Sequence, residues 1–64
     1  MVYINGKPLE AAGTALGDYL KENGYDPRRI AIERNGDILP KAQYQDTVLA
    51  EGDRIEIVRF VGGG

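Results

Sequence analysis

The sequence predicts an α+β fold in which a single mixed β-sheet is covered on one face by one helix. Apolar and polar residues alternate over several short segments, which is typical of half-buried strands, whereas residues 15–23 repeat apolar side chains at helical spacing. A chain of 64 residues buries only about 60% of the surface that its unfolded form exposes. These segments must therefore share one compact core in one domain.

The first hairpin is expected from residues 2–4 and 7–10, which are joined by Asn5-Gly6. Asparagine and glycine tolerate the positive φ angles that both central positions of a type I′ turn require. A binding loop at Asn5-Gly6 is the alternative interpretation.

A helix is expected over residues 15–23, with Thr14 as its N-cap because a threonine hydroxyl accepts a hydrogen bond from the first turn. Gly24 suits the left-handed residue that ends a helix, and Pro27 prevents its continuation. Gly17 costs about 1 kcal/mol relative to alanine in a helix interior. We interpret it as room for close packing on the sheet.

A second hairpin is expected from residues 29–34 and 37–39, with Asn35-Gly36 as its turn. Residues 41–49 have no sustained period and are expected to wrap the sheet as a short irregular or single-turn segment, with Tyr44 and Leu49 packing inward.

The final strand is expected over residues 54–61, after a turn at Glu51-Gly52-Asp53, with Ile55 and Ile57 on its core face. In the order hairpin, helix, hairpin, strand, the first and last strands can lie parallel in the centre of the sheet. This arrangement is the β-grasp, or ubiquitin-like, fold. We expect residues 1–61 to form the β-grasp domain and residues 62–64 a flexible glycine tail.

The composition excludes several classes of function. The sequence has no cysteine and no histidine, so it offers no thiolate nucleophile or metal ligand and no imidazole acid–base group. Glu51 and Asp53 together fall far short of the oxygen ligands that calcium prefers, and we expect no metal site and no catalytic residue. A net charge of −2 without a basic stripe argues against nucleic acid as a partner. No apolar run reaches the length of a membrane span, so a cytoplasmic protein without a membrane partner is expected.

The last three residues are the candidate reactive segment. Gly62, Gly63 and Gly64 follow the final strand directly, and a tail without Cβ atoms can thread a channel too narrow for other residues. The terminal carboxylate of Gly64 would then be presented inside a partner enzyme. Because a carboxylate is a poor electrophile, the partner has to activate it with ATP as an acyl-adenylate. A frayed terminus or an expression scar is the alternative.

A docking surface is expected beside the tail. Val58 and Phe60 alternate with the core residues of the final strand and should leave apolar surface exposed, and Val61 continues it. The alternative is that Phe60 folds back against the body. Arg59 is expected to be solvated, or else to pair with an acidic partner surface.

The run from Glu51 to Gly64 (EGDRIEIVRFVGGG) looks like the C-terminal signature of the ThiS family, the sulfur carriers of thiamine biosynthesis. The opening VYINGK and the segment RNGDILP resemble the family too, so the resemblance covers essentially the whole chain. The resemblance implies a carrier protein, not an enzyme, in which the tail residues Gly63 and Gly64 are essential for activation. An E1-like adenylating enzyme would use ATP, sulfur from a sulfur-donating enzyme would give a thiocarboxylate on Gly64, and thiazole synthase would accept that sulfur. No cofactor would be bound by this chain.

Three other functions stay open at this point. The first is the small subunit of molybdopterin synthase, or another thiocarboxylate carrier. The second is a protein modifier like ubiquitin, joined through Gly64 to lysines. The third is a non-covalent interaction module whose tail is inert.

Overall fold

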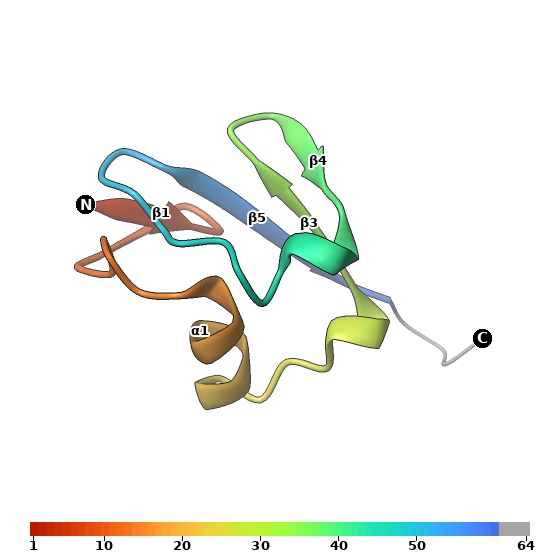
Figure 1. The fold of residues 1–64 in the computed structure, drawn as a ribbon. Coiled ribbons are helices and arrows are strands. Elements are labelled where there is room, and N and C mark those ends of the chain that lie inside the picture. Colours follow the sequence, from red (N-terminus) through yellow and green to blue (C-terminus); the bar gives the residue numbers. More distant parts are fainter. Residues whose placement is uncertain (61–64) are drawn as a thin grey trace.

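The computed structural model describes residues 1–60, which fold into a five-stranded sheet with one α-helix packed across one face (Figure 1). The elements in chain order are β1 (Val2–Ile4), β2 (Lys7–Leu9), α1 (Leu16–Glu22), the 3₁₀ turn η1 (Pro27–Arg29), β3 (Ile30–Arg34), β4 (Asp37–Leu39), the 3₁₀ turn η2 (Lys41–Gln43) and β5 (Arg54–Arg59). None of the helices in residues 1–60 has the length and apolar character needed to cross a membrane.

The strand order is β2-β1-β5-β3-β4, which places the last strand at the centre of the sheet. β1 and β5 run parallel, with Tyr3 beside Arg54, and the other neighbours are antiparallel. The predicted β-grasp arrangement, with the first and last strands parallel in the centre, is confirmed. The strand itself ends at Arg59, earlier than predicted, and Val61 lies outside the described residues.

Both predicted hairpin turns are confirmed, and their asparagines also hold β5. Asn5 and Asn35 have φ angles of 51° and 53° and precede glycines that also have positive φ, as a two-residue I′ turn requires. The amide N–H of Ile57 donates to Asn5 Oδ1 at 2.7 Å, and that of Arg54 donates to Asn35 Oδ1 at 2.9 Å. The two turns therefore fix both halves of the strand that leads into the tail.

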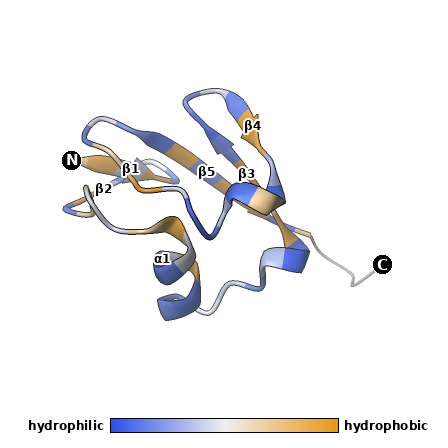
Figure 2. Ribbon diagram, in the orientation of Figure 1, coloured by the Kyte–Doolittle hydropathy of each residue, from blue (hydrophilic) through white to orange (hydrophobic). Residues whose placement is uncertain are grey.

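The core lies between α1 and the sheet. Leu16 and Leu20 of the helix pack against every second residue of the strands. Figure 2 shows the resulting alternation of apolar and polar positions along β5. Ile55 and Ile57 point inward as predicted, and Tyr44 and Leu49 are also buried as predicted. The irregular segment after β4 thus closes one side of the core.

The start of α1 differs from the prediction. Thr14 does not cap the helix: Ala15 occupies the N-cap position, without a side-chain hydrogen bond. Instead, the N–H of Leu16 donates to the carbonyl of Thr47 at 2.7 Å, and the N–H of Leu49 donates to the carbonyl of Thr14 at 2.9 Å. A backbone bridge to a segment more than 30 residues away therefore satisfies the first N–H of the helix, which a local capping rule cannot foresee.

Gly17 does make room for close packing, but not on the sheet. A Cβ at this position would lie 2.7 Å from Oε1 and 3.0 Å from Cα of Gln45. The predicted partner was wrong, because the irregular segment after η2 crosses this turn of the helix. The predicted end of the helix is confirmed, since Gly24 has a φ of 75°.

Asp53 anchors the start of β5. Asp53 is 6% exposed, and its carboxylate accepts hydrogen bonds from the Ala50 N–H at 2.9 Å, Asn35 Nδ2 at 3.1 Å and Arg34 Nε at 3.1 Å. Burial acts to raise the pKa of Asp53, but these hydrogen bonds and the charge of Arg34 outweigh it and hold the pKa below its ordinary value. Asp53 is thus a structural carboxylate that joins β5 to the β3–β4 turn.

Candidate functional site

The end of β5 is held in place up to the last described residue. The N–H of Phe60 donates to the carbonyl of Arg29 at 2.9 Å, and Arg29 ends the short turn η1. Asp26 caps that turn by accepting a hydrogen bond from the Arg28 N–H at 2.9 Å, and the hydrogen bonds from Arg28 lower the pKa of Asp26. The chain is therefore positioned by backbone contacts until it reaches the tail.

The tail itself lies outside the described residues. Val61, Gly62, Gly63 and Gly64 follow Phe60 in the sequence, so their predicted roles, and the boundary predicted between residues 61 and 62, stay predictions.

The side chains of Val58 and Phe60 are exposed, as predicted. Val58 is 58% exposed and lies on the face of β5 opposite its core residues, and Phe60, which follows β5, is 55% exposed. The ring of Phe60 contacts solvent and the Lys41 ammonium, which lies 5.7 Å from the ring centroid. Phe60 does not fold back into the core, and the docking role of this surface stays a prediction.

Sequence reasoning missed an exposed apolar side chain on the same face as Val58. Ile38 in β4 is 79% exposed, while its neighbour Leu39 is buried. In the sheet, β3 separates β4 from β5, and Ala31 of β3 lies beside Val58 of β5. The alternation within β4 could have placed Ile38 outward, but only the strand order shows that it shares a face with β5.

Arg59 points to the opposite side of the sheet, toward the helix. Its guanidinium lies 4.5 Å from the ring centroid of Tyr25, and Tyr25 stacks with Tyr19 at 6.5 Å between centroids. Burial, followed by the neighbouring Tyr25, raises the pKa of Tyr19. A cation–π contact therefore holds Arg59. The sequence did not predict this contact, because Tyr25 is 34 residues away from Arg59.

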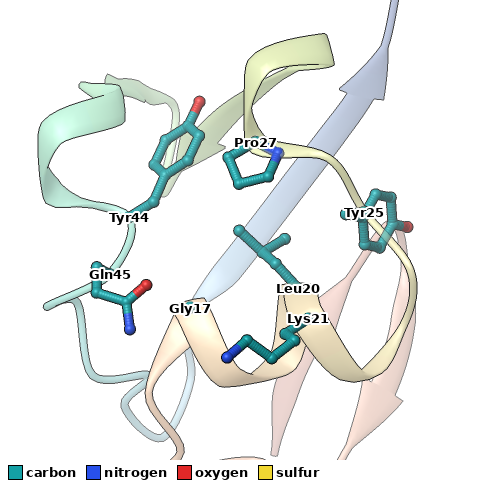
Figure 3. A pocket seen from close by; sticks show the side chains of 7 residues that line it. All are labelled: Gly17, Leu20, Lys21, Tyr25, Pro27, Tyr44 and Gln45. Carbon is teal, nitrogen blue, oxygen red and sulfur yellow. The ribbon is translucent and has the colours of Figure 1, made fainter.

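Hollows open on the described part of the surface beside α1 and beside the end of β5. One, of about 170 Å³, lies between α1, η1 and the segment after η2 (Figure 3), and is lined by Gly17, Leu20, Lys21, Tyr25, Pro27, Tyr44 and Gln45. Another, of about 180 Å³, lies beside the end of β5 and is lined by Gly24, Asp26, Arg29, Ile30, Arg59 and Phe60. Residues 1–60 bring no three metal-ligating side chains together.

The class is a small ubiquitin-like β-grasp protein, because residues 1–60 show this strand order and one α-helix across one face of the sheet. The sequence profile of the ThiS family matches residues 2–64. The chain belongs to the ThiS family.

Individual relatives agree with this assignment. The chain is 37% identical over 67 residues to the sulfur carrier protein ThiS of Bacillus subtilis, with all of both chains covered. It is 42% identical over 64 residues to a thiazole synthase of Magnetococcus marinus, with 98% of this chain and 20% of that protein covered. The chain thus spans about a fifth of the length of the thiazole synthases that it matches.

The fold has a solved counterpart. The crystal structure of the thiamine biosynthesis protein ThiS from Geobacter metallireducens superposes with a TM-score of 0.73 at 24% identity, and the match covers 98% of this chain and 97% of that one. At this identity the comparison supports the β-grasp fold.

Proposed function

We propose that this chain is a sulfur carrier of thiamine biosynthesis that acts through the carboxylate of Gly64. Membership of the ThiS family supports the proposal, as does its similarity over the full length to a protein named as a sulfur carrier. The observation that carries it is the central position of β5, which is hydrogen-bonded up to Phe60 and continues in sequence into three glycines. A folded domain of this kind presents the reactive end to a partner enzyme.

The chemistry needs two steps at the terminal carbon. In the first, a carboxylate oxygen of Gly64 attacks the α-phosphorus of ATP, pyrophosphate leaves, and an acyl-adenylate forms. In the second, a sulfur nucleophile attacks the acyl carbon and AMP leaves, so that the terminal carboxylate becomes a thiocarboxylate. The only sulfur in this chain is the thioether of Met1, so both ATP and sulfur come from partners and this chain is a co-substrate, not an enzyme.

Three partners follow from this scheme. An E1-like adenylating enzyme activates Gly64, a sulfur-donating enzyme supplies the sulfur, and thiazole synthase accepts it, with all steps in the cytoplasm. Segments similar to this chain within proteins named thiazole synthase support the third partner. Gly62 and Gly63 thread the active site of the partner, and Val58, Phe60 and Val61 belong to the surface that docks. ATP is used by the adenylating enzyme, and no cofactor is bound by this chain.

Intact-protein mass spectrometry tests the proposal. The chain is incubated with the adenylating enzyme, ATP and a sulfide source, beside a matched chain that lacks Gly64. We expect a mass gain equal to the replacement of oxygen by sulfur, seen only in the chain that has Gly64. No gain with a demonstrably active enzyme contradicts the proposal, and conjugates to lysines of other proteins would indicate a ubiquitin-like modifier instead.

A sulfurated chain also separates the pathways. Conversion of the product by thiazole synthase, with release of the unmodified chain, is expected for a carrier of thiamine biosynthesis. Turnover only by molybdopterin synthase would assign the same chemistry to the other pathway.

A further inference from the structure

The chain contains three Asn-Gly pairs, at residues 5–6, 23–24 and 35–36. In such a pair the glycine nitrogen can attack Cγ of the asparagine, because glycine has no Cβ to hinder the approach. The bond from Cγ to the side-chain nitrogen breaks, ammonia leaves with the proton of the glycine N–H, and a cyclic imide forms. Water then adds to one of the two imide carbonyls and opens the ring to aspartate or isoaspartate. All three asparagines are exposed, so water reaches them.

The fold ties two of these side chains to the segment that forms β5. Asn5 Nδ2 donates to the carbonyl of Ile57 at 3.3 Å, and Asn5 Oδ1 accepts from the N–H of the same residue at 2.7 Å. Asn35 Nδ2 donates to Asp53 Oδ1 at 3.1 Å, and Asn35 Oδ1 accepts from the Arg54 N–H at 2.9 Å. A carboxamide that keeps both hydrogen bonds is not free to turn its carbon toward the glycine nitrogen. The reaction at these two positions therefore requires local opening of the turn.

Asn23 has the same sequence context but is held by the last turn of α1 and not by β5. Its Nδ2 donates to the carbonyl of Tyr19 at 2.9 Å, and the N–H of Gly24 donates to the carbonyl of Lys21 at 3.2 Å. Helix ends fray at little cost in free energy. Asn23 is therefore an internal control for the effect of the hydrogen bonds to β5.

The consequence of the reaction differs between the two hairpin turns. Aspartate at position 35 places a second carboxylate against Asp53 Oδ1, where the amide of Asn35 donates in the intact chain. Because Asp53 is 6% exposed, the two negative charges meet where water solvates them poorly. Aspartate at position 5 meets the neutral carbonyl of Ile57 and still accepts from the Ile57 N–H. Deamidation thus replaces a hydrogen bond by a charge repulsion at the second turn, but not at the first.

We propose that Asn35 is a site of spontaneous deamidation whose products release β5 from the β3–β4 turn. Aspartate does so by repelling Asp53. Isoaspartate does so because it adds one atom to the main chain of a two-residue turn, which no longer fits I′ geometry. Since β5 is the central strand, the modification destabilises the whole sheet, and hydrolysis to ammonia makes it permanent. This inference goes beyond the proposed function and does not depend on it.

Peptide mapping by mass spectrometry tests how the fold controls the reaction. The folded chain and the chain unfolded in urea are kept at the same pH, and the replacement of NH₂ by OH is followed at each Asn-Gly pair. We expect the three rates to agree within about threefold in urea. In the folded chain, Asn5 and Asn35 should be slowed about tenfold or more, and Asn23 clearly less. Equal slowing at all three pairs, or no slowing at Asn35, overturns the inference.

Two matched pairs of variants separate the repulsion from the loss of the amide. Asn35→Asp is compared with Asn35→Gly, and Asn5→Asp with Asn5→Gly, because glycine accepts positive φ and adds no charge. We expect Asn35→Asp to melt roughly 8–16 °C below Asn35→Gly, and the two variants at position 5 to melt within about 4 °C of each other. Equal melting temperatures at position 35, or an equally large difference at position 5, overturn the inference.

Aged wild-type chain provides a measurement that needs no folded variant. Chromatography separates chains modified at Asn35 from chains modified at Asn23, and hydrogen exchange is measured at the amides of Arg54 and Ile57. We expect these amides to exchange about tenfold faster or more after modification at Asn35, and within about twofold of the intact chain after modification at Asn23. Exchange as slow as in the intact chain after modification at Asn35 overturns the inference.

Discussion

Replacement of Asp53 by asparagine tests how β5 is held in the sheet. The variant keeps the size of the side chain but removes the charge that faces Arg34, whose Nη2 lies 2.8 Å from Asp53 Oδ2. The NH₂ group of the new asparagine can take the position of Oδ2, which in the wild type accepts a hydrogen bond from the Ala50 N–H. A partly buried N–H donor then loses its acceptor, and the partly buried guanidinium of Arg34 loses its charged partner.

The magnitude follows from these contacts. Breaking a buried ion pair from one side costs about 3–5 kcal/mol, and the partial exposure of Arg34, 32% for its side chain, moves the expectation to the lower end. We expect the free energy of unfolding to fall by about 3 kcal/mol, which corresponds to a melting temperature roughly 12–24 °C lower in a domain of this size. Asp46→Asn, an exposed position in the preceding segment, is the matched control.

The pH dependence provides a second measurement. Because the pKa of Asp53 is lower in the folded state than in the unfolded state, its contribution to stability is present above the unfolded pKa of about 4 and is lost as the pH falls through the folded pKa. The difference in unfolding free energy between wild type and Asp53→Asn should therefore be largest near neutral pH and shrink below about pH 4. A variant that melts within about 3 °C of wild type, or a difference that is constant with pH, would refute this account of Asp53.

Three further predictions concern the helix, the docking surface and the tail. Gly17→Ala should lower the melting temperature despite the better helix propensity of alanine, because the new Cβ would lie 2.7–3.0 Å from atoms of Gln45. Gln45→Ala in the same background should recover part of the loss. A Gly17→Ala variant that is more stable than wild type would contradict the close contact. Phe60→Asp should weaken binding to the adenylating enzyme about tenfold or more while it changes the melting temperature little, since the ring is already half exposed; a large loss of stability in circular dichroism would place the ring in the core instead. Gly63→Val should abolish adenylation in a pyrophosphate-release assay without changing the fold, because a branched side chain does not fit a channel shaped for glycine; normal pyrophosphate release would argue against a narrow channel.

The features predicted correctly from the sequence depend on local backbone geometry. Asn5-Gly6 and Asn35-Gly36 indicated I′ turns because few other residue pairs accept positive φ at both positions. The outward direction of Val58 followed from the period of two in a strand, once Ile55 and Ile57 had been assigned to the core. The parallel pairing of the first and last strands in the centre of the sheet then followed from the order of the elements in a short chain.

The features that were missed depend on contacts between distant residues. Thr14 has the chemistry of a cap, but the backbone of the segment around Val48 bridges to Ala15 and satisfies the helix start instead. Asp53 was interpreted only as a turn residue, because its partners Arg34 and Asn35 are 18–19 residues away.

In the candidate site, the shared face of Ile38 and Val58 required the pairing of β3 with both β4 and β5, which no pattern within a single strand contains. The roles predicted for Gly62, Gly63 and Gly64 concern residues outside the described part of the chain, and mass spectrometry of the tail is their test.

The central position of β5 has a consequence for protein chemistry. Within the described sheet, the β1–β2 hairpin and the β3–β4 hairpin pair with β5 and not with each other. An isolated two-stranded hairpin is marginally stable in water, so a fragment of residues 1–50 should stay largely unfolded until the missing strand is supplied. A synthetic peptide of residues 51–64 contains that strand together with the whole tail. Complementation of the two fragments would let the terminus be made by chemical synthesis, as an amide, a thiocarboxylate or an isotope-labelled acid, and placed on a folded domain without any activating enzyme.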